Sequence, residues 1–194
     1  MLDMLTAQTL HQLLDQLGGL LAERETPVEV VAIGGGGLLL LGYIKRPTRD
    51  LDLVAVIDGG GLRRADPMPD VLRAAIDDVA RLNGLDSHWM NAAPSSLVDL
   101  GLPSGFMSRA IRRQHGALVL HLASREDQIA FKLYAAVDQG PDSKHVADLN
   151  ALAPTGAELL VSARWAVTHD VSSGFREQLV QALSHFGVDD DGSF

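Results

Sequence analysis

The sequence predicts an α+β protein, with a core of roughly 120 residues in which helices and strands alternate and a C-terminal part made of helices alone. Three observations predict this class. A β-branched run at 28–33 ends in four glycines, a second strand pattern follows at 50–57, and only helical spacing continues beyond Ser124. We therefore expect an α/β core over residues 1–123, a helical region over 124–188 and an acidic tail over 189–194.

Leucines dominate the start of the chain at a spacing that keeps one stripe of a helix apolar, and Pro27 ends that pattern. Glycine and proline then separate short apolar segments. In order, we expect a helix over 4–24, a strand over 28–33, a glycine turn over 34–37, a short buried helix over 38–43, a strand over 50–57 and a turn over 58–61.

The rest of the core and the helical region have clearer end signals. Pro69 and Asp70 open a helix that Gly84 ends, and Ser124 with Asp127 three residues later is a helix N-cap signal. We expect a helix over 69–84, a strand over 87–91, one short helix within 94–107, a strand over 117–122, and helices at about 124–137, 142–151, 155–168 and 174–186.

Composition excludes several classes of protein. The 194 residues include no cysteine, which excludes disulfides, thiolate zinc sites and a cysteine nucleophile. The formal net charge is −9, so a polyanion has to meet a local basic patch rather than the overall field of the protein. Every apolar run, such as Leu38–Leu41, is too short to span a bilayer, and the N-terminus has no signal-peptide pattern. We expect a cytoplasmic protein without a membrane partner.

Two carboxylates at the head of the second predicted strand are the main candidate for chemistry. Side chains alternate along a strand, so Asp50 and Asp52 share one face while Leu51 and Leu53 point to the other. Neighbouring carboxylates repel each other unless a divalent cation bridges them or water solvates them. Glycine backbone N–H groups nearby can approach phosphates, which favours Mg²⁺ shared between the carboxylates and a nucleotide. Taken alone, the glycines are more typical of a tight turn or a close helix–strand contact.

The stretch VAIGGGGLLLLGYIKRPTRDLDLV resembles the first motif of the nucleotidyltransferase superfamily that includes DNA polymerase β, in which a glycine pair precedes R-x-T-x-D-h-D-h. The matching positions are Gly34, Gly35, Arg46, Thr48, Asp50 and Asp52, with 14 residues between Gly35 and Asp50. In particular the chain is similar to a small bacterial branch related to AbiEii-type and MenT-type toxins. Trp89-Met90-Asn91 resembles the W-L-N strand of that branch, and its K-x-x-A/L-x-x-x-R…K-D-x-x-D-L helix pair is matched by Lys132, Lys144, Asp148 and Leu149.

The resemblance implies a fold, a cofactor and a reaction. The fold is a nucleotidyltransferase-like mixed β-sheet flanked by helices, and the reaction moves a nucleoside monophosphate from an NTP to a hydroxyl of RNA (tRNA) or protein. Mg²⁺ or Mn²⁺ would be held by Asp50 and Asp52, which with Lys132 and Asp148 form the expected catalytic set. The expected nucleotide-binding residues are Gly34, Gly35, Arg46, Thr48 and Arg49. The resemblance further implies a toxin of a toxin–antitoxin pair, with an antitoxin protein as the expected partner.

Two other hypotheses compete with an active nucleotidyltransferase. The superfamily typically uses a third carboxylate, for which Asp86 is the candidate nearest a strand, and His145 stands where the toxin branch has an aspartate. These departures favour a catalytically degenerate nucleotidyltransferase-fold protein with a binding or regulatory role. A dinucleotide-binding unit is excluded because Leu39 or Leu40 occupies the place of the third glycine, and no G-K-[ST] exists for a P-loop.

Overall fold

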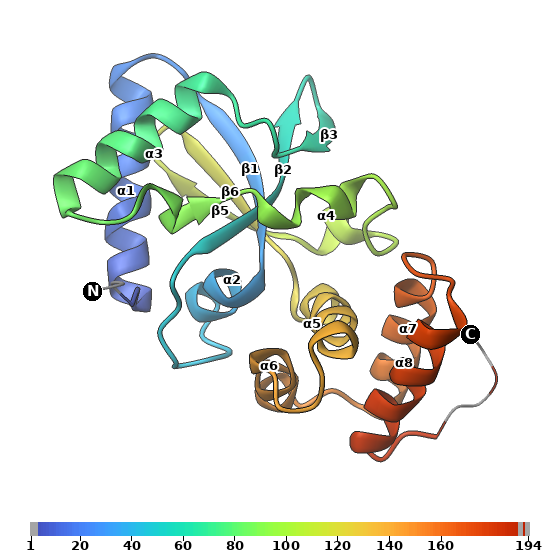
Figure 1. The fold of residues 1–194 in the computed structure, drawn as a ribbon. Coiled ribbons are helices and arrows are strands. Elements are labelled where there is room, and N and C mark those ends of the chain that lie inside the picture. Colours follow the sequence, from blue (N-terminus) through green and yellow to red (C-terminus); the bar gives the residue numbers. More distant parts are fainter. Residues whose placement is uncertain (1–3, 190–191, 193–194) are drawn as a thin grey trace. The chain divides into compact units, whose positions relative to one another are not determined.

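The computed structural model describes residues 4–189 and residue 192 and divides the chain into two compact units (Figure 1). The first unit comprises the residues up to Leu102 together with Met107–Ala123. The second comprises Pro103–Phe106 together with the residues from Ser124 onward. The α+β class and the helical C-terminal region predicted from the sequence are confirmed.

The first unit is built on a mixed, open sheet of six strands. The order is β3 (Gly61–Arg64), β2 (Leu51–Asp58), β1 (Val28–Ile33), β6 (Leu118–Leu122) and β5 (Ile111–His115), with the short β4 (Met90–Asn91) also paired to β2. Strand β1 runs antiparallel to β2 and parallel to β6, and β4 runs parallel to β2. The central strands β1 and β2 are mostly buried, as expected for β-branched and aliphatic runs.

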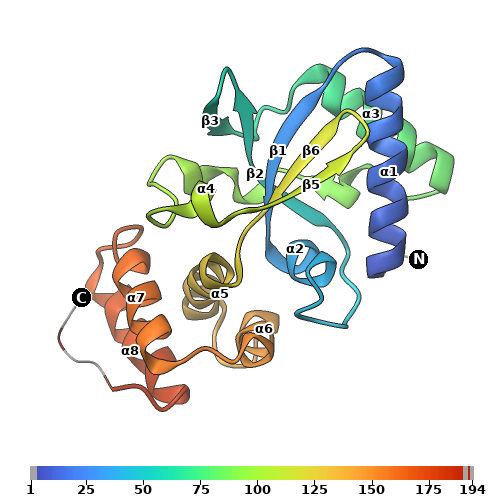
Figure 2. The same ribbon diagram turned by 180° about the vertical axis from the view of Figure 1, so that it is seen from behind.

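Helices α1 (Ala7–Glu23) and α3 (Asp70–Asn83) pack together on one side of this sheet (Figures 1 and 2). The leucine stripe of α1 is buried, and Thr6 caps the helix by accepting a hydrogen bond from the Thr9 N–H. Helix α3 ends where Gly84 adopts a left-handed conformation, as its sequence signals predict. Strand β2, which carries Asp52, therefore belongs to a well-packed unit.

The four glycines form a helix, and the predicted turn followed by a helix over 38–43 is wrong. Helix α2 spans Gly34–Leu40 and begins at the first glycine. The physical reason is close packing on strand β2, because a Cβ on Gly36 would lie 2.8 Å from the Asp50 carbonyl oxygen and equally close to Leu51. Glycine is required here for a close helix–strand contact, which was the simpler of the two interpretations of the glycine run.

Two strands were not predicted, and one was predicted too long. The first is β3, which begins at Gly61 and so shortens the turn expected over 58–61. The second is β5, which comes before the predicted strand at 117–122. Both missed strands are outer strands rich in arginine, without an apolar alternation to mark them. The strand expected over 87–91 is a 3₁₀ turn, η1 (Ser87–Trp89), followed by the two residues of β4. In place of the one short helix expected within 94–107, the structure has two short elements. They are the 3₁₀ helix η2 (Ala93–Val98), which starts one residue before that range, and α4 (Phe106–Arg109), which ends beyond it.

The second unit contains α5 (Arg125–Gln139), α6 (Lys144–Leu152), α7 (Gly156–Ala166) and α8 (Ser173–His185), close to the four predicted helices. Ser124 caps α5 as predicted, accepting a hydrogen bond from the Asp127 N–H. Helix α5 packs against the other three helices. The aromatic ring of Phe131 in α5 packs edge-on against the ring of Trp165, with the two ring centroids 5.3 Å apart. Aromatic pairs of this geometry add to the burial of apolar area.

Arg125 ties three helices of the second unit together. Its guanidinium donates to the Leu152 carbonyl at the end of α6, at 3.0 and 2.7 Å, and to the carboxylate of Glu158 in the first turn of α7. Glu158 also forms a capping box with Thr155. The hydrogen bond from Arg125, followed by that from the Thr155 backbone, lowers the pKa of Glu158 from 4.5 to about 2.

This lowered pKa predicts an acid-sensitive contribution to stability. Because the folded state binds the Glu158 proton more weakly than the unfolded state, the contribution is present above about pH 4.5 and is lost as the pH falls toward the folded-state pKa of about 2. The two side chains are 32% and 30% exposed, so solvent screening leaves an expected loss of about 1–2 kcal/mol. Urea unfolding at pH 5 and pH 2.5 should show a smaller difference in Glu158→Gln than in the wild type. An unchanged difference in Glu158→Gln, relative to the exposed control Glu177→Gln, would contradict the assignment.

The predicted acidic tail lies partly beyond the described part of the chain. Asp189 is exposed, whereas Asp190 and Asp191 lie outside the described residues. Over residues 4–189, no helix combines the length and apolar character needed to cross a membrane.

Candidate functional site

Asp50 and Asp52 line one cleft of about 600 Å³ in the first unit. Asp50 immediately precedes β2 and Asp52 is its second residue, and both side chains are half-buried. The rest of the cleft wall comes from the end of β3 and the segment after it, from the first turn of α3, and from the region of η1, β4 and η2. Its other polar and charged lining residues are Arg64, Asp66, Arg73, Ser87, His88, Asn91, Ser95 and Ser96.

The Asp52 carboxylate lies between a glycine and an asparagine. A Cβ on Gly34 would come within 2.7 Å of Asp52 Oδ2, and Gly34 has a positive φ of 78°. On the other side, Asn91 Nδ2 donates to Asp52 Oδ1 at 3.2 Å across the parallel pairing of β4 with β2. The Asn91 oxygen accepts a hydrogen bond from the Ala93 N–H at 2.9 Å, which orients the amide with its NH₂ group toward Asp52.

The structure also brings Arg46 and Thr48 next to the glycine segment. A Cβ on Gly35 would lie 3.3 Å from Thr48 Oγ1 and 3.6 Å from an Arg46 guanidinium nitrogen. Thr48 is buried, and its backbone exchanges hydrogen bonds with Leu5 at 2.6 and 3.0 Å. Its hydroxyl donates to the Asp50 carbonyl at 3.3 Å, which ties the loop to the start of β2. Arg49 is exposed on the same loop.

Among the residues that the structure describes, no third carboxylate is placed to complete a metal site with Asp50 and Asp52. Asp86 caps η1, where hydrogen bonds from the His88 backbone N–H and then from the His88 ring lower the pKa of its carboxyl group. Asp66 lines the same cleft as Asp50 and Asp52, yet within the described residues no group of three His, Asp or Glu side chains is placed to hold a metal ion. A cation at Asp50 and Asp52 would need further oxygen ligands from a nucleotide or from water.

The remaining predicted site residues, Lys132 and Asp148, belong to the second unit. They form an ion pair between α5 and α6, with Lys132 Nζ 2.8 Å from Asp148 Oδ2. The two side chains are 4% and 1% exposed, so both charges are removed from solvent. A buried pair of this kind is strongly destabilised when one partner is lost.

Sequence reasoning did not anticipate the contacts that fix Asp52. The W-M-N stretch pointed to Asn91, but not to its hydrogen bond with Asp52, which depends on the pairing of strands 39 residues apart in the chain. Asp66 follows β3, and no local signal revealed this strand. Comparison of the chain with protein-family models, with curated proteins and with solved structures gives no match.

Gly34 offers a direct test of the site geometry. Gly34→Ala places a methyl group against Asp52 Oδ2, and we expect the carboxylate to move and divalent-cation binding in the presence of an NTP to weaken about tenfold. Alanine at positive φ also costs about 1–2 kcal/mol of stability. The binding of Mn²⁺, followed by its electron paramagnetic resonance signal, measures the first effect, and thermal unfolding measures the second.

Gly42→Ala is the matched control for this substitution. Gly42 has a nearly identical φ of 77°, and nothing lies within 4 Å of a Cβ built there. Because of the positive φ, both variants should therefore lose a similar amount of unfolding free energy, while only Gly34→Ala loses cation binding. Equal cation binding in the two variants would show that the Gly34–Asp52 contact has no role in a metal site.

Proposed function

We propose that the chain is a Mg²⁺-dependent nucleotidyltransferase that moves a nucleoside monophosphate from an NTP to a hydroxyl of RNA, such as tRNA, or of a protein. The observation that carries the proposal is the Asp52 carboxylate held between Gly34 and Asn91, with Asp50 in the same cleft. The adjacent placement of Gly35, Arg46 and Thr48 supports it. These positions match the superfamily motif, and they adjoin one another in the folded first unit.

The donor set at Asp50 and Asp52 fits Mg²⁺ or Mn²⁺. Both side chains offer hard oxygen ligands in a solvent-accessible cleft, and Mg²⁺ is usually held by one or two carboxylates together with substrate phosphates. When bound, the ion would supply Lewis-acid polarisation of phosphate oxygens and neutralise the charge of the leaving group. The lack of a three-residue metal cluster among the described residues predicts that the cation binds tightly only together with the nucleotide.

The chain's own residues have three roles in the proposed reaction. Asp50 and Asp52 hold the cation, and Asn91 orients the Asp52 carboxylate. The backbone at Gly34 and Gly35, with the Arg46 guanidinium beside it, attracts the β- and γ-phosphates.

In the group transfer the acceptor hydroxyl oxygen forms a bond to the α-phosphorus. The bond from that phosphorus to the oxygen bridging to the β-phosphate breaks, so pyrophosphate leaves with the bonding electron pair. The proton of the acceptor hydroxyl passes to solvent, which reaches the open cleft. In-line displacement of this kind requires positioning and charge stabilisation more than covalent chemistry by the protein.

The toxin role, an antitoxin protein as partner, and the participation of Lys132 and Asp148 belong to the same proposal and rest on the resemblance. Lys132 would neutralise charge on the triphosphate and Asp148 would orient it or a neighbouring group. In the second unit the two side chains hold each other in place, which gives them a structural role in addition.

One observation favours a second candidate function, a catalytically degenerate binding or regulatory protein. The residue of β4 that pairs with Asp52 of β2 is Asn91, whose side chain is an amide rather than a carboxylate. A second metal ion would therefore lack a charged ligand there. Such a protein would bind an NTP with Mg²⁺ and transfer nothing.

The deciding experiment incubates the protein separately with each of four NTPs labelled on the α-phosphate, with Mg²⁺ and either a tRNA pool or a protein pool. We expect one NTP to label one pool, with the label abolished by EDTA. Binding without transfer, seen as an NTP-induced thermal shift with no labelled product, supports the degenerate alternative. No product and no thermal shift with any NTP would sink both.

A further inference from the structure

The cleft that holds Asp50 and Asp52 extends beyond the residues assigned to the cation and the triphosphate. Gly34 lies against Asp52 Oδ2, whereas Asn91 donates to Asp52 Oδ1. Of the described residues that line the cleft, none belongs to the expected nucleotide-binding set, and the wall continues from Asn91 to η2 and to the start of α3. The cleft therefore has a part, on the Asn91 side of Asp52, that the proposed reaction leaves to the acceptor.

Arg73 supplies a positive charge to this part of the cleft. It is the fourth residue of α3, and its exposed side chain lines the cleft. Arg64 at the end of β3 also lines the cleft, but its guanidinium donates to the Asp99 carboxylate at 3.2 Å. Arg73, in contrast, forms no ion pair and no side-chain hydrogen bond within the described residues. Its charge is therefore available to an anion that enters the cleft.

A buried hydroxyl lines the same cleft without a partner. Ser95 belongs to η2, and only 2% of the residue is exposed. Its backbone N–H donates to the Ala92 carbonyl at 3.1 Å, but its hydroxyl forms no hydrogen bond with any residue that the structure describes. Most buried hydroxyls in folded proteins are hydrogen-bonded, because burial without a partner costs free energy. A ligand atom that accepts a hydrogen bond in the cleft would supply this partner.

A phosphate group satisfies both side chains. A guanidinium binds two phosphate oxygens through parallel N–H donors, and a serine hydroxyl donates to oxygens of the same kind. The carboxylates of Asp50, Asp52 and Asp66 share the cleft and repel an anion. A divalent cation at Asp50 and Asp52 reverses this local field, so phosphate binding at Arg73 and the proposed cation site support each other.

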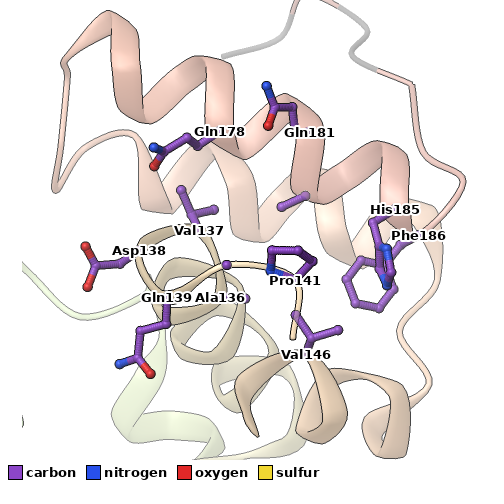
Figure 3. A pocket seen from close by; sticks show the side chains of 12 residues that line it. Ala136, Val137, Asp138, Gln139, Pro141, Val146, Gln178, Gln181, His185 and Phe186 are labelled. Carbon is purple, nitrogen blue, oxygen red and sulfur yellow. The ribbon is translucent and has the colours of Figure 1, made fainter. Parts of the chain in front are cut away.

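A cleft within the second unit lacks these features (Figure 3). Its volume is about 480 Å³, and Val137, Pro141 and Phe186 give it apolar walls. No lysine, arginine, serine or threonine occurs among the described residues that line it. A phosphate would find neither a guanidinium nor a hydroxyl there, so of these two clefts only the one in the first unit suits a phosphate.

We propose that Arg73 and the Ser95 hydroxyl bind a phosphate of the acceptor, and that these two residues select RNA over protein as the acceptor. In RNA every ribose hydroxyl has a phosphodiester within one nucleotide, whereas the serine, threonine and tyrosine hydroxyls of an unmodified protein have none. With this phosphate on the Asn91 side of Asp52 and the triphosphate on the Gly34 side, the attacking hydroxyl lies between them. The inference rests on the proposed function, because it assigns the acceptor of that reaction.

Arg73→Gln removes the charge from the cleft, and Arg176→Gln is its matched control. Arg176 is also exposed, is also the fourth residue of a helix, and forms no ion pair within the described residues, but it does not line the cleft. The probe is a short single-stranded RNA with a 5′ fluorescein label, and fluorescence anisotropy measures its binding to the full chain with Mg²⁺ and without NTP. We expect Arg73→Gln to bind this RNA about tenfold more weakly and to reduce the salt dependence of log K by about one unit of slope, while Arg176→Gln matches the wild type.

Ser95→Ala distinguishes a ligand contact from a structural one. Because the hydroxyl makes no hydrogen bond to the described protein, its removal should leave the thermal unfolding temperature unchanged or raise it. RNA binding should nevertheless weaken about threefold, through loss of one hydrogen bond to phosphate. A lower unfolding temperature together with unchanged RNA binding would show that Ser95 is structural.

Transfer assays complete the test and separate the two proposals. With the NTP found in the pool experiment, Arg73→Gln should raise the KM for RNA about tenfold. The KM for the NTP, and Mn²⁺ binding in its presence, should stay within about twofold of the wild type.

Three results would overturn the acceptor assignment and leave the nucleotidyltransferase proposal standing. They are equal RNA binding by Arg73→Gln and Arg176→Gln, a higher KM for the NTP instead of the RNA, and labelling of the protein pool instead of the tRNA pool. Absence of NTP binding and of transfer in the wild type would defeat the nucleotidyltransferase proposal itself, and the acceptor assignment with it.

Discussion

Asp52→Asn is expected to reduce nucleotide transfer on the order of a thousandfold, because it removes one of the two carboxylates proposed to hold the cation. The asparagine side chain has nearly the same size, so it keeps its place beside Gly34 and the fold is preserved. Initial rates of label transfer, measured with the NTP and acceptor found in the pool experiment, give the effect on catalysis. Mn²⁺ binding in the presence of that NTP should be lost in parallel.

Asp58→Asn is the control for this variant. Asp58 is the last residue of the same strand, and its side chain is 74% exposed. Its carboxylate forms a surface ion pair with Arg63 at 3.6 Å. The substitution makes the same chemical change outside the cleft and should leave the rate within about twofold. If Asp52→Asn retains more than a tenth of the activity, the carboxylate pair is not the metal site.

Lys132→Met is expected to lower the free energy of unfolding by about 3–5 kcal/mol. The substitution leaves the Asp148 carboxylate buried at 1% exposure without its lysine partner. Methionine preserves most of the aliphatic length of lysine, so the loss reports on the charge rather than on a cavity. Urea or thermal unfolding of the full chain measures it, with circular dichroism following the helices.

Two further variants separate a buried pair from a general effect of removing lysine. Lys144→Met changes an exposed lysine at the start of α6 and should cost less than about 0.5 kcal/mol. The double variant Lys132→Met/Asp148→Leu removes both charges and should recover most of the lost stability. The interpretation is wrong if Lys132→Met is no more costly than Lys144→Met.

The elements that could be predicted from the sequence are those whose signals are local. Ser124 marks the start of α5, Gly84 the end of α3, and the β-branched run gives β1 at its observed bounds. Strands β3 and β5 could not be predicted, because a strand at the edge of a sheet needs no apolar alternation. The glycine helix α2 depends on how closely Gly36 approaches strand β2, which is a tertiary contact.

The same division holds for the candidate site. The alternation of Asp50 and Asp52 with leucines indicated a shared face, and both carboxylates do line one cleft. The positions of Gly34 and Asn91 on either side of Asp52 depend on the packing of α2 and on the pairing of β4 with β2. Neither is encoded by spacing along the chain. Lys132 and Asp148 lie on two successive helices, α5 and α6, so their spacing along the chain likewise could not predict that they pair with each other.

The arginines of the outer strands have a consequence for how copies of this protein behave at high concentration. Strand β5 ends the sheet and carries Arg112 and Arg113, both exposed to solvent, while β3 at the other end carries Arg63 and Arg64. An outer strand presents backbone groups to which another copy can add by β-pairing, and like charges brought face to face oppose that addition. The residues that hide these strands from hydrophobic patterning thus protect the open sheet from edge-to-edge aggregation.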